Sequence, residues 1–314
     1  MTAWQPNDSA KFNSLYYTGA TDYELTSHFS GSSPDKISKH ISRQVQAGML
    51  VRRGLFAKVW EQQVKTPDNA GDRELPVEMV VDLASLPKPF TTGDPANILV
   101  IGDTHLPFCL DGYLEFCRAQ QERFNCGTVV HIGDEVDNCA MSYHELNPDG
   151  HGAGREADLA QRELYKWYHV FPEVKVIIGN HSSMHFRKAF TSGIPKRFLK
   201  DYSSVWDAPS TWTWHMELEM YGVYFVHGTG SAGDRAAYNK ALTRRQSVVQ
   251  GHIHTIASVQ HSSSPSDCIY GMQVGCGVDD ESYAMAYAKV NAKPSILSCG
   301  VILDAGKTPF IVTM

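Results

Sequence analysis

Five short apolar segments, each followed closely by polar residues, constrain the fold of this 314-residue chain more than any other feature. The segments are 97–101, 128–132, 174–178, 223–226 and 248–250. Continuous apolar runs rich in valine and isoleucine are typical of strands that are buried on both faces of a sheet. Helical patterns at 113–126 and 155–171 separate the first three segments. This alternation of strand and helix predicts an α/β fold.

The residues that follow these five segments are mostly of the types that bind metal ions. The polar groups are Asp103-Thr104-His105, Gly133-Asp134-Glu135-Val136-Asp137, Gly179-Asn180-His181, His227 and Gly251-His252-Ile253-His254. Imidazole nitrogens and carboxylate or amide oxygens suit manganese, iron and zinc, and the chain has 14 histidines. Because ligands bind at the carboxyl ends of strands in open α/β sheets, the sequence predicts that these side chains meet in one metal centre.

In this order the five groups resemble the motifs of the calcineurin-like metallophosphoesterase superfamily, which run D-x-H, G-D-x-x-D, G-N-H-D/E, H and G-H-x-H. The resemblance covers about residues 97–255. It implies a four-layer α/β/β/α sandwich that binds two divalent ions, Mn²⁺ by preference, with iron, zinc, nickel or magnesium as alternatives. It also implies the ligands: Asp103, His105 and His254 for one ion, Asn180, His227 and His252 for the other, and Asp134 as a bridge between them.

The same resemblance implies the chemistry of phosphate ester hydrolysis. Two ions about 4 Å apart share a hydroxide, lower its pKa and hold both oxygens of an in-line displacement at phosphorus. His181 matches the histidine that faces the scissile phosphate, and Asp137 matches the carboxylate that orients it. His181 would then protonate the leaving oxygen, with its pKa held near the working pH by Asp137. Glu135 is expected to point away from the metals.

The sequence departs from the superfamily pattern at two places. Ser182 follows the G-N-H motif where an acidic residue is usual, which leaves the anchor of this loop unassigned. Asn138 follows Asp137 where the protein Ser/Thr phosphatases have a phosphate-clamping arginine, and this argues against a phosphoprotein phosphatase. The arginines considered as substitutes are Arg155, Arg187, Arg197 and Arg235.

Residues 1–60 have a different character. A helix is predicted to begin at Ser33-Pro34 and to end at Gly48, and two short strands hinged at Arg53-Gly54 follow it. With a short helical pattern before it, this arrangement resembles a winged helix-turn-helix module. The stretch 36–58 contains no acidic residue, so it is predicted to contact nucleic acid. The alternative is a docking module with a solvated basic face. The predicted contacts are Lys36, Lys39, Arg43, Arg52, Arg53 and Lys58.

Composition and spacing also predict the organisation of the chain. The expected regions are a winged-helix-like module at 1–60, a proline-rich linker at 61–96 and a metallophosphoesterase domain at 97–314. Three late apolar runs, Ile269–Val274, Ile296–Leu303 and Phe310–Val312, are predicted to complete a second sheet. No apolar run approaches the roughly 20 residues that cross a bilayer, which excludes a membrane protein. The seven cysteines are scattered and form no C-x-x-C pair, which favours a cytoplasmic location.

The net charge does not exclude a nucleic-acid partner. The total of −6 combines seven basic and four acidic residues in 1–60, a local charge of +3, with −9 for the remainder. The leading hypothesis is therefore a phosphodiesterase or nuclease that acts on nucleic acid. The alternative enzyme is a phosphomonoesterase or small-nucleotide phosphodiesterase whose N-terminal module serves docking or dimerisation. A non-enzymatic alternative is a DNA-binding regulator with a degenerate phosphoesterase domain, against which the intact ligand set argues.

Overall fold

A computed structural model of the protein describes residues 83–143, 150–231, 233–281 and 294–314. The predicted winged-helix-like module at 1–60 lies outside the described residues, together with its six basic residues Lys36, Lys39, Arg43, Arg52, Arg53 and Lys58. Of the predicted linker, residues 83–96 are described. They contain the 3-10 helix η1 (Leu83–Ser85) and the first three residues of strand β1 (Asp94–Ile101). None of the described helices is long and apolar enough to cross a bilayer.

The first sheet has six strands in the order β11-β10-β1-β2-β3-β4. Besides β1, its strands are β2 (Cys126–His131), β3 (Val174–Ile177), β4 (Trp212–His215), β10 (Ser298–Leu303) and β11 (Thr308–Thr313). Strands β1 to β4 run parallel, whereas β10 is antiparallel to both of its neighbours, β1 and β11. The carboxyl ends of β1, β2 and β3 therefore lie at one edge of this sheet.

The second sheet has five strands in the order β5-β6-β7-β9-β8. They are β5 (Glu217–Met220), β6 (Val223–Val226), β7 (Ser247–Gln250), β8 (Ala257–Ser263) and β9 (Cys268–Val274). The three inner strands β6, β7 and β9 are parallel, and antiparallel strands close both edges. Two of the five predicted ligand-bearing strands, β6 and β7, thus belong to this sheet and not to the first.

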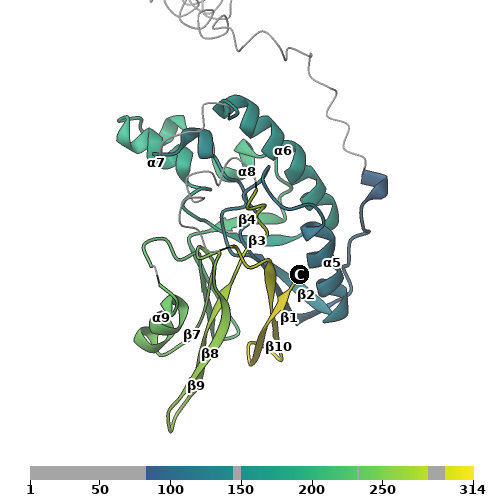
Figure 1. Ribbon diagram of the computed structural model, residues 1–314, viewed down its shortest axis with the longest axis vertical. Helices are drawn as coiled ribbons and strands as arrows, with labels where there is room; N and C mark the ends of the chain where they lie inside the picture. Colours follow the sequence, from purple (N-terminus) through teal and green to yellow (C-terminus); the bar gives the residue numbers. More distant parts are fainter. Residues whose placement is uncertain (1–82, 144–149, 232, 282–293) are drawn as a thin grey trace, which may run out of the picture. The chain divides into compact units, whose positions relative to one another are not determined.

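Helices cover the outer face of each sheet (Figure 1). The helices are α5 (Tyr113–Arg123), α6 (Ala153–Val170), α7 (Met184–Thr191), α8 (Tyr202–Val205) and α9 (Ala236–Arg244), with the 3-10 helices η2 (Cys139–Met141) and η3 (Lys196–Phe198). Buried residues of α5 and α6 pack on the first sheet, and Ala241 of α9 packs on the second. The predicted four-layer α/β/β/α sandwich is confirmed.

Strand β1 shows how one short sequence serves two layers. Side chains alternate across a strand, so Leu99 and Ile101 face the core beneath the helices, while Ile98 and Val100 face the core between the sheets. All four are fully buried. Burial of each such side chain stabilises the fold by about 1.5–3 kcal/mol. A strand that is apolar on both faces therefore holds a central position, and its polar carboxyl end is held rigidly.

One prediction about the sheets is wrong. The run Ile269–Val274 corresponds to β9 and does lie in the second sheet, but the last two apolar runs form β10 and β11 of the first sheet. Ile302 of β10 pairs with Ile98, which places β10 along the free side of β1. Strand β9 therefore belongs to the second sheet and the next strand, β10, to the first. The predicted turn at Leu303–Lys307 does join β10 to β11.

Candidate metal centre

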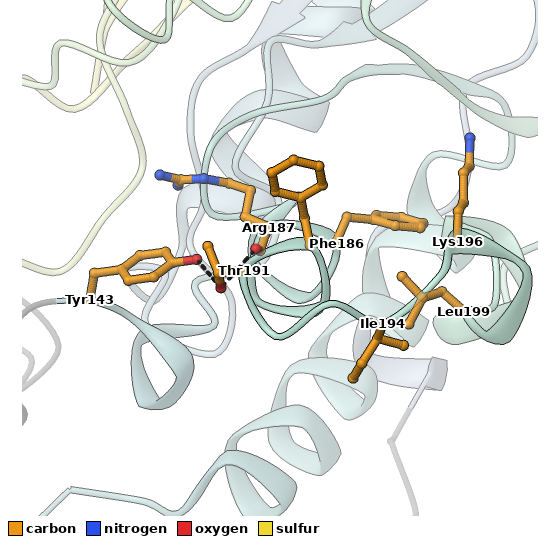
Figure 2. A pocket seen from close by; sticks show the side chains of 8 residues that line it. Tyr143, Phe186, Arg187, Thr191, Ile194, Lys196 and Leu199 are labelled. Atoms are coloured by element: carbon orange, nitrogen blue, oxygen red, sulfur yellow. Dashed lines mark hydrogen bonds between the residues drawn. The ribbon is translucent and has the colours of Figure 1, made fainter.

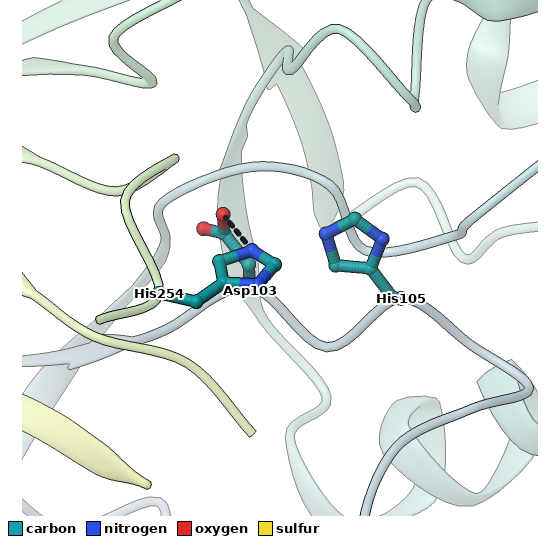
Figure 3. A group of neighbouring side chains, drawn as sticks. All are labelled: Asp103, His105 and His254. Carbon is teal, nitrogen blue, oxygen red and sulfur yellow. Dashed lines mark hydrogen bonds and ion pairs between the residues drawn. The ribbon is translucent and has the colours of Figure 1, made fainter. Parts of the chain in front are cut away.

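The loops that follow β1 and β7 bring a carboxylate and two histidines together. Nε2 of His254 lies 3.2 Å from Oδ2 of Asp103, and the backbone N–H of His252 donates to the same oxygen at 2.9 Å. The ring of His105 faces this pair, with its centroid 5.0 Å from that of His254 (Figure 3). Asp103, His105 and His254 each offer a ligand atom within 4.8 Å of the others. They form a first group that is able to hold a metal ion.

A second group gathers around Asp134, at the end of β2. Nε2 of His227 lies 3.0 Å from Oδ2 of Asp134 and 3.1 Å from Oδ1 of Asn180. Nδ1 of His227 donates to the carbonyl of Ile132 at 3.1 Å, which leaves Nε2 as the nitrogen that is free to bind a metal. His252 completes the group with Asp134 and His227.

Asp134 lies between the two groups. Its Oδ2 is 3.9 Å from Nε2 of His105, which belongs to the first group, and 3.0 Å from Nε2 of His227, which belongs to the second. Its other oxygen, Oδ1, accepts hydrogen bonds from the backbone N–H groups of His181 and Ser182 at 2.7 and 3.2 Å. This fixes the carboxylate with Oδ2 facing both histidines.

Asp137 connects His105, a member of the first group, with His181. Its Oδ1 lies 2.5 Å from Nδ1 of His105 and 3.1 Å from Nδ1 of His181, and its carbonyl oxygen lies 2.6 Å from Nδ1 of His181. Because these acceptors hold Nδ1 of His181, its Nε2 is the atom available to a substrate. The rings of His105 and His181 meet edge to face with centroids 4.5 Å apart. Asp137 thus orients both rings.

The donor atoms of these groups fit a pair of divalent ions. Oδ1 of Asp103 and Nε2 of His105 are buried and lack a hydrogen-bond partner among the described residues. A buried polar atom without a partner costs about 1–3 kcal/mol, a cost that a bound metal ion would remove. Three-ligand sets of imidazole and carboxylate, with the amide oxygen of Asn180 added, suit first-row transition metals.

The backbone of the centre is strained where it turns these side chains inward. His105, Asp134 and His252 have φ angles of 46°, 48° and 71°, in the left-handed region that residues other than glycine rarely occupy. Gly179 leaves room for the carboxylate of Asp134, because a Cβ atom there would lie 2.0 Å from its Oδ1. Gly251 does the same for Asp103, with a Cβ at 2.4 Å from Oδ1.

The electrostatics of the metal-free centre follow from burial and close opposite charges. Burial alone would raise the pKa of the Asp134 carboxyl, but His227 holds it well below its usual range. Burial would lower the pKa of His227, and Asp134 and Asp103 instead raise it to about 9. The pKa of His181 is likewise raised to about 9, against the effect of burial, by Asp137 and Asp134. The pKa of His252 is lowered by burial and by His227.

Ser182, which stands where the superfamily has an acidic residue, is fully buried and anchors this loop through Glu135. Its hydroxyl donates to Oε2 of Glu135 at 2.5 Å and accepts from the backbone N–H groups of Asp134 and Gly179 at 3.1 and 3.3 Å. Nε1 of Trp214, on β4, donates to Oε1 of Glu135 at 2.9 Å. A carboxylate from the neighbouring loop therefore takes over the anchoring position.

Sequence reasoning assigned no role to Glu135, whose carboxylate accepts hydrogen bonds from Ser182 and Trp214 and belongs to neither ligand group. It also missed Glu156, whose Oε2 accepts from Sγ of Cys139 at 2.9 Å and from the N–H of Ala140 at 3.0 Å. A signal was available for Glu156, since it stands four residues before Ala160 on the buried stripe of α6. No comparable local signal exists for Glu135, because its partners come from distant segments.

Among the four arginines considered as phosphate ligands, Arg187 contacts the centre. Its Nη1 donates to the carbonyl of Asn180 at 3.2 Å. Nε of Arg235 instead donates a hydrogen bond to Oε1 of Gln260 on β8 at 3.2 Å. The other two arginines are exposed: Arg155 lies on α6 and Arg197 on η3.

The structure brings together all nine residues that the sequence placed in the centre. They are Asp103, His105, Asp134, Asp137, Asn180, His181, His227, His252 and His254. They come from five loops that are up to 151 residues apart along the chain. The six predicted nucleic-acid contacts lie outside the described residues.

Comparison with known proteins agrees with this geometry. The family model for calcineurin-like phosphoesterases matches residues 96–279, which is more than half of the chain. No curated protein sequence matches this chain. Two similar solved structures are Vacuolar Protein Sorting 29 from Cryptosporidium parvum (12% identity, 69% of this chain and 96% of that one, TM-score 0.34) and Vps29 from Chaetomium thermophilum (11%, 69% and 95%, TM-score 0.35). From the family match, we conclude that the chain belongs to the calcineurin-like phosphoesterase family, whose chemistry is the metal-dependent hydrolysis of phosphate esters.

Proposed function

We propose that this protein is a two-metal phosphodiesterase that cleaves nucleic acid. The observation that carries the hydrolytic part is the presence of two adjacent ligand groups with Asp134 between them. The preference for nucleic acid is supported by the basic stretch 36–58, which has no acidic residue. Polynucleotide backbones attract such stretches electrostatically.

In this proposal Asp103, His105 and His254 hold one ion, and Asn180, His227 and His252 hold the other. Asp134 contributes to both sites. Mn²⁺ is the proposed metal, because the carboxylate and amide oxygens of both sets suit it, while the imidazoles leave iron, zinc and nickel as alternatives. Two such ions supply the positive charge that polarises a phosphoryl group and lowers the pKa of an attacking water.

The protein's own contribution to bond cleavage is the placement of a proton. Asp137 holds Nδ1 of His181 through two oxygens at 2.6 and 3.1 Å, so the ring presents Nε2 to the substrate. The side chain of His181 is 16% exposed, whereas those of Asp137 and His105 are almost fully buried. His181 therefore lies at the open side of the centre and donates its Nε2 proton to the leaving oxygen.

The test is a substrate screen on the full chain with Mn²⁺. Labelled single-stranded and duplex DNA and RNA are compared with bis(p-nitrophenyl) phosphate and with p-nitrophenyl phosphate. The proposal expects cleavage of a nucleic acid and of the diester. Hydrolysis of the small esters with no nucleic acid cleaved would instead indicate the small-substrate alternative.

A second arm tests the bridging carboxylate. Asp134→Ala should lower turnover by about a thousandfold, because both metal sites lose a ligand. Asp158→Ala, which removes an exposed carboxylate of α6, is the matched control and should keep full activity. Unchanged turnover in Asp134→Ala would refute the metal assignment.

A further inference from the structure

The segment 184–200, which includes α7 and η3, combines aromatic residues with basic ones. It contains five basic residues and no acidic one, and three phenylalanines lie among them. Two of these rings face solvent: Phe190 is 83% exposed and Phe198 is 73% exposed. Isolated exposed apolar residues are common, but Phe190 lines a groove together with two further aromatic residues, Phe186 and Tyr143. The basic residues are Arg187, Lys188, Lys196, Arg197 and Lys200.

A groove of about 660 Å³, which we call the α7 groove, runs along this segment (Figure 2). Its apolar lining consists of Tyr143, Phe186, Phe190, Ile194 and Leu199, and the cations Arg187 and Lys196 line it as well. The volume lies within the range of small-ligand sites.

Internal contacts hold the groove in shape. The hydroxyls of Tyr143 and Thr191 are hydrogen-bonded at 3.2 Å, which ties the two walls together. Nζ of Lys188 lies 3.8 Å from the centroid of the Tyr143 ring, and the guanidinium of Arg187 lies 5.5 Å from it.

The groove adjoins the metal centre. Helix α7 begins three residues after His181, and Tyr143 follows Asp137 by six residues. Both walls thus leave directly from loops that carry residues of the centre. Arg187 makes the contact itself, because its Nη1 donates to the carbonyl of Asn180 at 3.2 Å. A substrate whose phosphate sits at the metals would place its neighbouring groups against this surface.

We propose that the α7 groove binds the unpaired nucleotides of a single-stranded polynucleotide beside the scissile phosphate. The inference rests on the proposed function and adds the substrate's strandedness and its contact surface. Exposed aromatic rings stack on bases of any sequence, and the cations between them pair with the backbone phosphates. A duplex keeps the faces of its bases stacked and cannot use the rings in this way. The five basic residues of segment 184–200, with no acidic residue among them, give this surface a charge that complements a polynucleotide backbone.

The experiment measures cleavage and binding by the full chain carrying Phe190→Ala, which removes the exposed ring from the lining of the groove. The substrates are an oligothymidylate of about 12 nucleotides and a duplex of the same length. Cleavage assays contain Mn²⁺, and binding assays contain a chelator so that the substrate is not cut. Loss of this stacking ring should weaken single-strand binding and lower kcat/KM about 10- to 100-fold. Duplex binding and the kcat for bis(p-nitrophenyl) phosphate should stay within about twofold.

Charge and control variants accompany Phe190→Ala. Lys196→Gln and Arg197→Gln should each reduce the slope of log Kd against log salt by about 0.7, the value for one single-strand phosphate contact. Tyr221→Ala, in the turn between β5 and β6, and Lys307→Gln, between β10 and β11, remove an exposed ring and an exposed cation outside the segment. Both control variants should behave like the wild type.

The outcomes separate this inference from the proposed function. If the wild type cuts single strands and the phenylalanine variant binds and cuts them equally well, the groove assignment is wrong and the nuclease proposal stands. Equal losses on strand and duplex would refute base stacking. If the wild type hydrolyses the small diester but neither binds nor cuts any nucleic acid, both proposals fall.

Discussion

Ser182→Ala removes a buried hydroxyl that makes three hydrogen bonds next to Asp134. One of them, to the Glu135 carboxylate at 2.5 Å, is a bond to an acidic group and contributes about 2 kcal/mol. The other two, from the N–H groups of Asp134 and Gly179 at 3.1 and 3.3 Å, are longer and contribute about 0.5 kcal/mol each. The expected loss in the free energy of unfolding is about 3 kcal/mol, or roughly a hundredfold in the folding equilibrium.

Ser183→Ala is the matched control. Its hydroxyl donates to the carbonyls of Gly179 and Asn180 at 2.7 and 3.3 Å, but these carbonyls also accept from the N–H of Ser183 and from Arg187. Because no acceptor is left empty, this variant should lose only about 1 kcal/mol. Urea unfolding of the metal-free protein, followed by tryptophan fluorescence, measures both values.

The same variants should separate in metal binding. Partners that orient metal ligands typically change affinity or activity 10- to 100-fold when they are removed, so Ser182→Ala should require that much more Mn²⁺ for half-maximal activity. A double-mutant cycle with Glu135→Gln should give a coupling energy of at least about 1 kcal/mol. Equal destabilisation by Ser182→Ala and Ser183→Ala, with no coupling to Glu135, would refute the anchoring role of Ser182.

Three further predictions concern the centre and the core. Gly179→Ala should displace the Asp134 carboxylate, since the new Cβ would lie 2.0 Å from its Oδ1. The free energy of unfolding, measured by thermal unfolding, should fall by about 1–3 kcal/mol, and activation by Mn²⁺ should weaken. Wild-type stability and activation in this variant would contradict the geometry. Metal binding should release protons, because the pKa of His227 is raised to about 9, against the effect of burial, by Asp134 and Asp103. Below pH 9 the ion must displace that proton, so affinity should rise with pH by up to about tenfold per unit; calorimetry in buffers of different ionisation enthalpy measures the release, and a pH-independent affinity would be inconsistent. In the native protein at pH 8, one thiol should react rapidly with a disulfide reagent, that of the exposed Cys268, because burial raises the pKa of thiols such as Cys126, to about 12. All seven thiols should react only after unfolding. Rapid reaction of four thiols in the native protein would show that the core is open.

The centre was predictable because its information is local. Each ligand group follows a strand that is apolar without interruption, as Ile98–Ile101 precedes Asp103, and the direction of a buried strand decides where its carboxyl end lies. The short spacing in Asp103-x-His105 and His252-x-His254 keeps the pairs together whatever the rest of the chain does. Strand, turn and ligand are read from about ten consecutive residues.

What the sequence determined by itself was therefore the five strands that carry the centre, the nine residues of the centre and the family, whereas strands β4, β5 and β8 were not predicted. The tertiary structure alone decided that β10 and β11 join the first sheet, that Glu135 meets Ser182, and that Phe190 and Arg187 share a groove beside the centre. The physical reason is the range of the interactions. A strand's apolar pattern states that it is buried, but not which neighbour it pairs with, and a buried carboxylate or an exposed ring acquires its role only from side chains that distant segments bring to it.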